Sequence, residues 1–339
     1  MGFLPSIAIV THPTRLEGLR RRWGTLGQAK FRLKMAHEQE EVLREGGTAT
    51  KAALLRNKRQ KTPAHQAQQA VFTEYQQEDD VYRRVVDQLE NDLQFGLPVK
   101  RVDRSFVPYF DFQTCQVVVV VGQDGLVANT AKYVGDIPIV AVNPDPQRID
   151  GVLLPFQVGE AEKAVRRVLE GKHRKRPVTL AEVNLNDGQK LLAFNDFFIG
   201  AGSHVSARYQ IEVSGRSEPQ SSSGILVSTG AGSTGWLSSV FNMAGGVAQF
   251  LGAAVEARPT IAWEDRKLVW AVREPFVSKR SGARLVAGWL EEQQELIIES
   301  LMPDHGVIFS DGIEQDYLPF NSGAIARVTV SRQRANLVV

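Results

Sequence analysis

The sequence has almost none of the residues from which small secreted domains and zinc modules are built. Among its 339 residues Cys115 is the sole cysteine, and only six residues are histidine. An internal disulfide is therefore impossible, and no Cys/His cluster is available for a structural zinc ion. We predict a protein that holds no metal of its own and works in the reducing cytoplasm.

Two further absences narrow the choice of partners. The 40 basic and 38 acidic side chains nearly balance, and the formal net charge is +2, which argues against a strongly electropositive nucleic-acid binder. The longest apolar runs are too short to span a membrane. Residues 1–10 lack the basic start and apolar core of a secretory signal. We therefore expect neither nucleic acid nor a membrane among the partners.

The first half of the chain alternates between strand and helix patterns. Apolar strand patterns occupy residues 7–10, 99–102, 117–121 and 138–143. A helix pattern between them has apolar residues at four-residue spacing, namely Val81, Val85, Leu89 and Leu93. This alternation predicts an α/β fold with a doubly wound, Rossmann-like N-terminal domain, whose ligands bind at the carboxyl ends of the parallel strands.

The second half has a different pattern. Short alternating runs between Gly, Pro and Asp turns predict mainly antiparallel strands, interrupted by one helix at 235–247. The predicted strands are 191–194, 207–213, 224–228, 267–272, 295–299, 306–310 and 324–330. This half is therefore expected to be β-rich and sandwich-like.

These patterns divide the chain into two domains. Residues 1–158 form the α/β domain, with an insertion near 46–70 that is flexible or loosely helical. Residues 159–339 contain a connecting helix at 160–169, a charged linker at 172–176 and the β-rich domain.

The segment Val117–Ala131 is the most informative part of the sequence. Five consecutive valines break into Gly122-Gln123-Asp124-Gly125 and then into a helix pattern. The glycines permit a tight turn and close approach of the backbone to a ligand, and the start of the helix favours an anion. Such a turn is typical of a phosphate site. An acid there is unsuited to bind phosphate itself, so Asp124 is a candidate for proton transfer or metal contact.

Two polar segments in the second half are also candidate sites. The loop Ser228–Thr234 offers backbone amides and hydroxyls that suit phosphate or ribose, but it lacks the lysine and the glycine spacing of a Walker A loop. A plain strand-to-helix turn explains the same composition. Asn195-Asp196, after the strand at 191–194, suits a base edge or a sugar hydroxyl, with an ordinary Asx turn as the alternative.

The order of these motifs resembles the NAD kinase family, most of all its mitochondrial-type branch. In that family a Gly-Gly-Asp-Gly turn in an α/β domain precedes an asparagine–acid pair and a threonine-glycine-serine loop in a β-rich domain. The resemblance runs from about residue 99 to near the C-terminus. Its matching segments are 143–148, 151–154, 195–200, 222–224, 229–236, 273–275 and 321–326.

The resemblance implies ATP-dependent phosphorylation of the 2′-hydroxyl on the adenosine ribose of NAD, giving NADP. In that scheme Asp124 orients the hydroxyl and accepts its proton, Mg²⁺ arrives with ATP, and the β-rich domain binds NAD as substrate. A homo-oligomer, either a dimer or a tetramer, is also implied. The implied nucleotide-binding residues are Gly122, Gln123, Gly125, Asn143, Asn195, Asp196, Thr229, Gly232, Ser233, Thr234 and Trp236.

Two residues depart from the family pattern. Gln123 stands in place of the second glycine of the turn, and Leu126 replaces the threonine that usually follows. If the second position requires a left-handed backbone, a glutamine there costs roughly 1–2 kcal/mol. Farther along, Asp311-Gly312 resembles a late aspartate-glycine pair of the family and is expected to form a turn.

Two other functions stay open on the sequence. Related folds phosphorylate lipid alcohols from a similar turn, so a kinase of another small hydroxyl compound, a sugar or a lipid, is one alternative. The other is a non-catalytic NAD- or nucleotide-binding sensor, in which Gln123 and Leu126 mark a relaxed turn. Asp124 argues against the sensor, because a pure binding site has no need of an acid beside phosphates.

Overall fold

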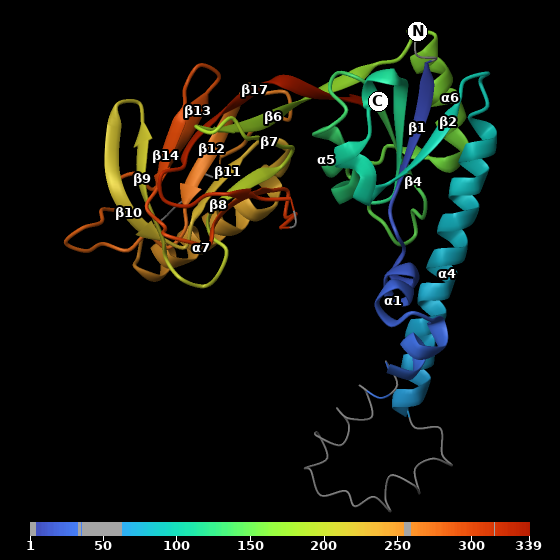
Figure 1. The fold of residues 1–339 in the computed structure, drawn as a ribbon, viewed down its shortest axis with the longest axis horizontal. Coiled ribbons are helices and arrows are strands. Elements are labelled where there is room, and N and C mark those ends of the chain that lie inside the picture. Colours follow the sequence, from blue (N-terminus) through green and yellow to red (C-terminus); the bar gives the residue numbers. More distant parts are fainter. Residues whose placement is uncertain (1–4, 33–34, 36–62, 254–258, 315) are drawn as a thin grey trace, which may run out of the picture.

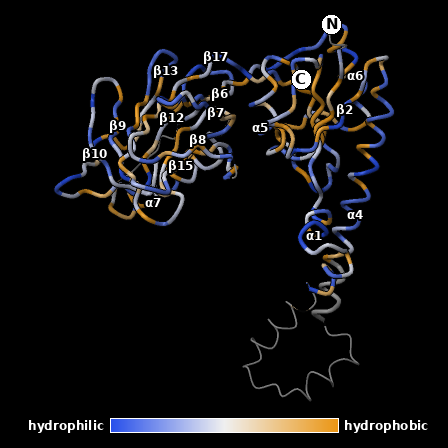
Figure 2. The backbone as a smooth tube through the Cα atoms, viewed as in Figure 1, coloured by the Kyte–Doolittle hydropathy of each residue, from blue (hydrophilic) through white to orange (hydrophobic). Residues whose placement is uncertain are grey.

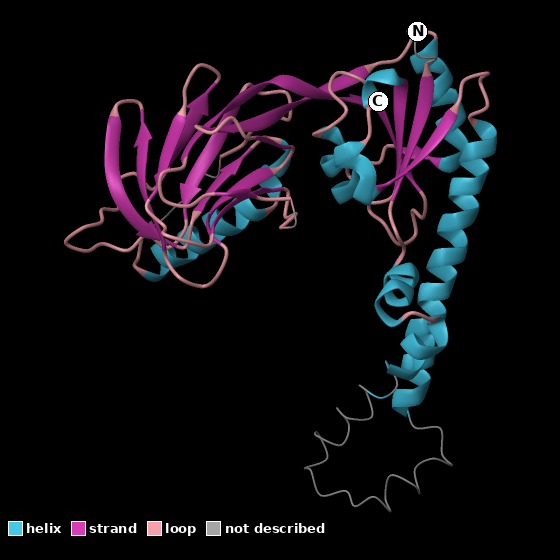
Figure 3. Cartoon of the chain, viewed as in Figure 1, coloured by secondary structure: helices cyan, strands magenta, loops and turns pink. Residues whose placement is uncertain are grey.

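The computed structural model describes residues 5–32, 35, 63–253, 259–314 and 316–339. The chain forms two lobes joined by a pair of long strands (Figure 1). The first lobe is a parallel sheet with helices on both faces, and the second is built from antiparallel sheets with one helix (Figure 3). The predicted fold class, a doubly wound α/β lobe followed by a β-rich lobe, is confirmed.

The first-lobe sheet has the strand order β4-β3-β1-β2, and all of these neighbours are parallel. The strands are β1 (Ser6–Thr11), β2 (Val99–Asp103), β3 (Cys115–Val121) and β4 (Pro138–Asn143), with the short β5 (Phe156–Gln157) beside β4. Because β1 and β3 are buried on both faces, they consist of nearly continuous apolar residues rather than an alternating pattern. Figure 2 shows this concentration of hydrophobic residues in the sheet.

Helices cover both faces of this sheet. On one face α4 (Pro63–Asp92) and α6 (Val158–Leu169) pack against Ile7 and Ile9 of β1. On the other, α5 (Asp124–Ala131) packs against the alternate residues of the same strands. The sequence predicts a connecting helix at 160–169, and the structure shows that the apolar face of this helix, α6, is also part of the first-lobe core.

The first part of α4 projects beyond the sheet beside α1 (Arg15–Trp23), as Figure 1 shows. Thr14 and Glu17 form a capping box at the start of α1, and Arg15 contacts Glu74 and Glu78 of α4. Much of the insertion predicted at 46–70 lies outside the described residues. Its described part, from residue 63 onward, belongs to α4.

The second lobe contains one complete six-stranded sheet and most of the strands that extend the first-lobe sheet. The six-stranded sheet has the order β13-β12-β11-β8-β15-β16 and is antiparallel. Its strands are β8 (Asp196–Ala201), β11 (Ile225–Ser228), β12 (Lys267–Val272), β13 (Ala287–Glu291), β15 (Gly306–Ser310) and β16 (Leu318–Pro319). The facing strands are β6 (Lys175–Leu185), β7 (Lys190–Ala193), β9 (Ala207–Val213), β10 (Arg216–Ser222), β14 (Leu296–Ser300) and β17 (Ile325–Val338).

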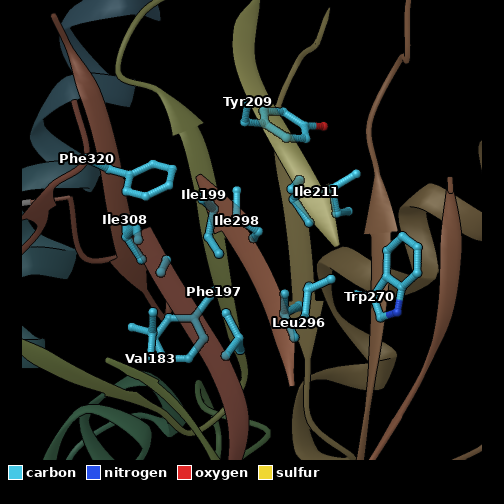
Figure 4. Packing of buried hydrophobic residues seen from close by; sticks show 14 of the residues in the cluster. Val183, Phe197, Ile199, Tyr209, Ile211, Trp270, Leu296, Ile298, Ile308 and Phe320 are labelled. Atoms are coloured by element: carbon cyan, nitrogen blue, oxygen red, sulfur yellow. The ribbon is translucent and has the colours of Figure 1, made fainter. Parts of the chain in front are cut away.

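The core of the second lobe lies between these two layers. Figure 4 shows Phe197 and Ile199 of β8 among side chains from the facing strands, including Tyr209 and Leu296. The opposite side of the six-stranded sheet is covered by α7 (Trp236–Phe250), which confirms the helix predicted at 235–247.

The two lobes share β6 and β17. The end of β17 runs parallel to β4, with Asn336 opposite Pro138, while β17 also pairs with β6 along its length. Lys175 and Arg176, predicted to lie in a charged linker, instead begin β6. The prediction failed because β6 begins with three exposed or half-buried residues, and its buried residues start only at Val178.

No helix in the described part of the chain is both long and apolar enough to cross a membrane.

Candidate functional site

The turn between β3 and α5 lies at the carboxyl edge of the first-lobe sheet. Gly122 is needed for packing, because a Cβ there would lie 2.7 Å from Cδ2 of His12. Gln123 has φ −114° and ψ 164°, an ordinary extended conformation at the N-cap of α5. The condition for a penalty, a left-handed backbone at this position, is therefore not met, and the glutamine carries no conformational cost.

Asp124 begins α5, and its carboxylate is held from the side by a second loop. Its Oδ1 accepts a hydrogen bond from Leu153 N at 2.8 Å, and its Oδ2 accepts one from Val152 N at 3.1 Å. The side chain is half-buried. Because each carboxylate oxygen has a second acceptor position, the group can still receive a proton from a substrate while its orientation is fixed.

The loop that holds Asp124 is itself organised by Asn143. Asn143 Nδ2 donates to Ile149 O at 2.9 Å, and Asn143 Oδ1 accepts from Asp145 N at 3.0 Å. Gly151 has φ +66°, and a Cβ there would lie 2.8 Å from Asn143 Nδ2. In this structure the buried Asn143 amide shapes the loop rather than facing open space, so it acts on Asp124 indirectly.

His12 is a residue of this edge that sequence reasoning missed. It follows β1, whose neighbours β2 and β3 lie on opposite sides, and this reversal of direction is where open α/β sheets bind ligands. Its backbone N–H donates to Tyr82 Oη at 3.0 Å, and Tyr82 Oη donates to Val121 O at 2.8 Å. The strand order rather than any local motif brings His12 to Gly122.

A pocket of about 490 Å³ opens at this position, between the ends of β1 and β3 and the side of α4. His12 and Gln123 are among the residues that line it, together with Tyr82 from α4. In Figure 1 this edge of the sheet faces the projecting parts of α1 and α4.

The second-lobe candidates centre on Asn195 and Asp196. Asn195 lies in the turn after β7 and Asp196 begins β8, whereas the sequence placed the pair at the end of the preceding strand. Neither side chain makes a hydrogen bond to any residue that the structure describes, so the Asx-turn alternative does not apply. Both side chains are therefore available to a ligand.

The carboxylate of Asp311 holds this turn by accepting hydrogen bonds from its backbone. Its Oδ1 accepts from Asn195 N at 2.6 Å and its Oδ2 from Phe194 N at 3.2 Å. It occupies a turn with φ +56°, as expected for Asp311-Gly312. Burial raises the pKa of Asp311, and the Lys132 ammonium, 3.5 Å away, opposes that rise.

Asp196 has an unusual electrostatic position. The residue is 7% exposed, and it lies close to a second buried carboxyl group, that of Asp311. Burial first, and the nearby Asp311 second, raise its pKa from 3.8 to about 7. Asp196 can therefore change its protonation state near neutral pH, which is a common property of residues in functional sites.

The loop after β11 packs against the Asn195 turn. Thr229 is buried, and its hydroxyl donates to Phe194 O at 2.5 Å. A Cβ on Gly232 would lie only 2.2 Å from Asn195 O. Thr229 and Gly232 thus hold the two segments together, and the hydroxyl and glycine content that suggested a ligand site has this structural purpose.

The other residues of this loop differ in whether their side chains are used within the protein. Ser233 Oγ donates to Gly230 O at 2.7 Å, so it too is used within the loop. Thr234 is exposed, and its hydroxyl has no partner among the described residues. The Trp236 ring stacks on Phe198 with centroids 5.7 Å apart, and the Arg273 guanidinium lies 5.1 Å from the indole centroid.

The sites from the two lobes flank α5. Asp124 begins this helix and Lys132, which contacts Asp311, follows its end, so a rise of 1.5 Å per residue separates them by about 12 Å. The α5 residues Leu126 and Val127 share a core with Phe194 beside the second-lobe turn. The fold therefore brings both candidate sites to one region of the molecule.

Among the described residues, no three His, Cys, Asp or Glu side chains lie close enough together to hold a metal ion.

Two solved structures have the same architecture. The yeast NADH kinase complexed with NADH is 15% identical, with a TM-score of 0.55, over 99% of this chain and 84% of that chain. The NAD kinase from Archaeoglobus fulgidus in complex with ATP is also 15% identical, with a TM-score of 0.53, over 75% of this chain and 89% of that chain.

The chain has the two-domain NAD kinase fold. No protein-family model matches the sequence, and neither does any curated protein. At 15% identity the similarity shows the fold, and a fold by itself does not determine an activity.

Proposed function

We propose that the protein is an ATP-dependent kinase that phosphorylates the 2′-hydroxyl on the adenosine ribose of NAD. The observation that carries this proposal is the Asp124 carboxylate, fixed by Val152 N and Leu153 N beside the glycine turn. The Asn195 turn, with Asp196, lies near Lys132 at the other end of the same short helix. The fold shared with structures that contain NADH or ATP agrees with this assignment.

In the proposed reaction Asp124 removes the proton from the ribose 2′-hydroxyl as its oxygen attacks the γ-phosphorus of ATP. The bond between the γ-phosphorus and the β,γ-bridging oxygen breaks, and ADP leaves with that electron pair. The products are NADP, ADP and a protonated Asp124, which returns its proton to solvent.

The second-lobe residues would bind NAD. Asn195 and Asp196 offer an amide and a carboxyl to ribose hydroxyls or the adenine edge. The exposed Thr234 hydroxyl and the Trp236 ring border the same loop, and the ring stacked on Phe198 offers a surface for a base. Thr229 and Gly232 would act by holding this loop against Asn195.

Mg²⁺ and the oligomeric state come from the family resemblance, and the cytoplasmic location comes from the single cysteine. Mg²⁺ would arrive bound to ATP and neutralise phosphate charge. The protein would work in the cytoplasm, as a dimer or a tetramer.

The deciding experiment incubates the purified protein with NAD, ATP and Mg²⁺ and measures NADP directly by chromatography. NADP formation that requires all three components is the expected result. Saturable NAD binding without product would instead favour a sensor, and ATP hydrolysis stimulated only by a sugar or lipid alcohol would favour another kinase. NADH should be compared with NAD in the same assay.

A further inference from the structure

The projecting part of the first lobe carries a concentration of positive charge that the proposed reaction does not use. Residues 15–32, called here the basic arm, comprise α1 and a helical segment at 26–32. They include six arginine and lysine residues but a single acidic one, Glu17, whereas the whole chain has a formal net charge of only +2. We propose that the basic arm binds a single-stranded nucleic acid. This binding does not depend on the phosphotransferase function proposed above.

Most cations of the basic arm have no carboxylate to neutralise them. Arg15 and Arg21 contact acids, on α4 and at the end of β2 respectively. No acidic side chain in the described part of the chain pairs with the other four, which are all exposed, namely Arg20, Arg22, Lys30 and Arg32. Because like charges repel one another, a polyanion that binds among them is attracted at several points. The balanced charge of the whole chain, from which we expected no nucleic-acid partner, conceals this local excess.

Aromatic rings orient three of these cations. The guanidinium carbons of Arg22 and Arg32 lie 5.1 and 5.6 Å from the centroid of the Trp23 ring, so two cations share one indole. Lys30 Nζ lies 5.2 Å from the centroid of the Phe72 ring on α4. A ring holds a cation without removing its charge. The arginine N–H groups can therefore still bind phosphate oxygens in pairs, as the planar guanidinium favours.

Phe31 provides a surface on which a base can stack. It is 59% exposed and stands between Lys30 and Arg32 in the sequence. A base can stack on a protein ring only when it is not already stacked within a duplex. An exposed ring flanked by cations is therefore typical of a site for single strands, where stacking tolerates many sequences and the phosphates make binding depend on salt.

The distribution of charge on α1 favours a nucleic acid over a membrane surface. Arg20, Arg21 and Arg22 are consecutive, so at about 100° per residue they point in three directions around the helix. A helix that lies on anionic lipid instead presents one apolar face to the membrane. In α1 Leu16 is buried and Leu19 is half-buried, which leaves no exposed apolar face.

The basic arm is separate from the proposed NAD site. Figure 1 shows that α1 projects beyond the first-lobe sheet and stands clear of the second lobe. A nucleic acid bound to the arm would therefore leave the Asn195 turn free.

The test measures binding of a fluorescein-labelled 20-nucleotide RNA of mixed sequence by fluorescence anisotropy at several salt concentrations. The double variant Arg22→Gln, Arg32→Gln should bind at least about tenfold more weakly than the wild type. The slope of log K against log salt should also become shallower by about 1.4, because each lost phosphate contact contributes about 0.7 for a single strand. Binding and slope equal to those of the wild type would overturn the proposal.

The matched control removes the same charge elsewhere. Arg166→Gln with Arg327→Gln changes two arginines that are also about half exposed, each of which is paired with a glutamate. This variant should bind the RNA as the wild type does. A loss equal to that of the Arg22 and Arg32 variant would show that only the total charge matters, and would overturn the assignment to the arm.

Phe31→Ala tests the stacking surface. It should weaken RNA binding at least about fivefold, whereas Phe276→Ala, at a second-lobe position that is 64% exposed, should leave it unchanged. The same RNA annealed to its complement should bind the wild-type protein more weakly than the single strand does. Equal or tighter binding of the duplex would contradict a site for single strands.

Three measurements on the wild-type protein do not depend on the folding of any variant. Ultraviolet crosslinking should attach the RNA to peptides containing residues 20–32, and crosslinks confined to the second lobe would overturn the proposal. Saturating NAD and the non-hydrolysable ATP analogue AMP-PNP should leave the RNA bound, because displacement by them would place it in the nucleotide sites instead. The protein should prefer the RNA to polyglutamate and to phosphatidylserine vesicles, and a preference for either would refute the nucleic-acid assignment.

Discussion

Lys132 and Asp311 form an ion pair that joins the two lobes, with Nζ and Oδ2 3.5 Å apart and each side chain only 2% exposed. Lys132 follows α5 of the first lobe, and Asp311 supports the Asn195 turn of the second. Lys132 Nζ also donates to Ser310 Oγ at 2.8 Å. The pair therefore connects the helix that begins with Asp124 to the proposed NAD site.

Removal of Lys132 from its pair with Asp311 should lower the stability of the protein. Lys132→Met leaves Asp311 buried without its cation, and we expect a loss of about 3–5 kcal/mol in the free energy of unfolding. Lys172→Met breaks the exposed pair with Glu170 and should cost at most about 1 kcal/mol. Urea denaturation of both variants measures the difference, and equal effects would show that the buried pair adds nothing.

Asp124→Asn tests the proton acceptor. The amide keeps the size of the side chain but cannot take a proton, so kcat for NADP formation should fall at least about a hundredfold. The KM for NAD should change little, because Asp124 acts mainly in the transition state. Thermal unfolding serves as the folding control, and turnover equal to that of the wild type would remove Asp124 from the mechanism.

Asp196 should make stability depend on pH. Its pKa is 3.8 when unperturbed and about 7 in the folded protein, so between these values the folded state binds a proton that the unfolded state has released. The contribution of the Asp196 proton to the free energy of unfolding is therefore fully present below pH 3.8, and it is lost as pH rises through about 7. Asp196→Asn should flatten this dependence relative to the wild type in denaturation measured from pH 5 to pH 8.

The exposed Asp304, with 76% of its side chain accessible, provides the control for that comparison. Asp304→Asn should keep the pH profile of the wild type. An Asp196→Asn profile that coincides with both would show that Asp196 has an ordinary pKa in the folded protein.

Gly232→Ala tests the contact between the loop and the Asn195 turn. Its Cβ would lie 2.2 Å from Asn195 O, so the backbone must shift, at a cost of roughly 1–3 kcal/mol. We also expect weaker NAD binding by calorimetry, because Asn195 moves with the turn. Gly245→Ala, at a position in α7 with nothing within 4 Å, should raise stability slightly instead.

Gln123→Gly tests whether the backbone of Gln123 is unstrained. Because Gln123 already has an extended backbone, glycine relieves no strain and adds entropy to the unfolded chain. The free energy of unfolding should fall by about 0.4–1 kcal/mol in denaturant titration. A gain in stability would mean that the glutamine is strained after all.

The elements around Asp124 could be predicted because their signals are local. Consecutive valines followed by a glycine turn define β3 and the start of α5 within about fifteen residues. The sequence also predicted Asn195-Asp196 as a candidate pair, but it placed both residues at the end of the preceding strand, whereas Asp196 begins β8. Polar residues at the ends of short strands leave such boundaries poorly marked.

The contacts that complete the site could not be predicted, because they depend on which strands become neighbours. His12 lies beside Gly122 only because β1 pairs with β3, and Lys132 contacts both Asp311 and Ser310, the latter 178 positions away in the sequence. Likewise, the glycines near Asn195 have composition typical of a phosphate loop, but the structure uses Gly232 for close backbone packing.

The shared strand β17 also has consequences for how the protein is made. Asn336 Nδ2 donates to Asp136 O, a contact between residues 200 positions apart in the sequence. On the ribosome the first lobe would lack this neighbour of β4 until the last part of the chain has emerged. Synthesis of the N-terminal half therefore leaves the start of β4, at Pro138 and Ile139, without a neighbour on one side, where a chaperone, or the β17 segment of another copy, has time to bind.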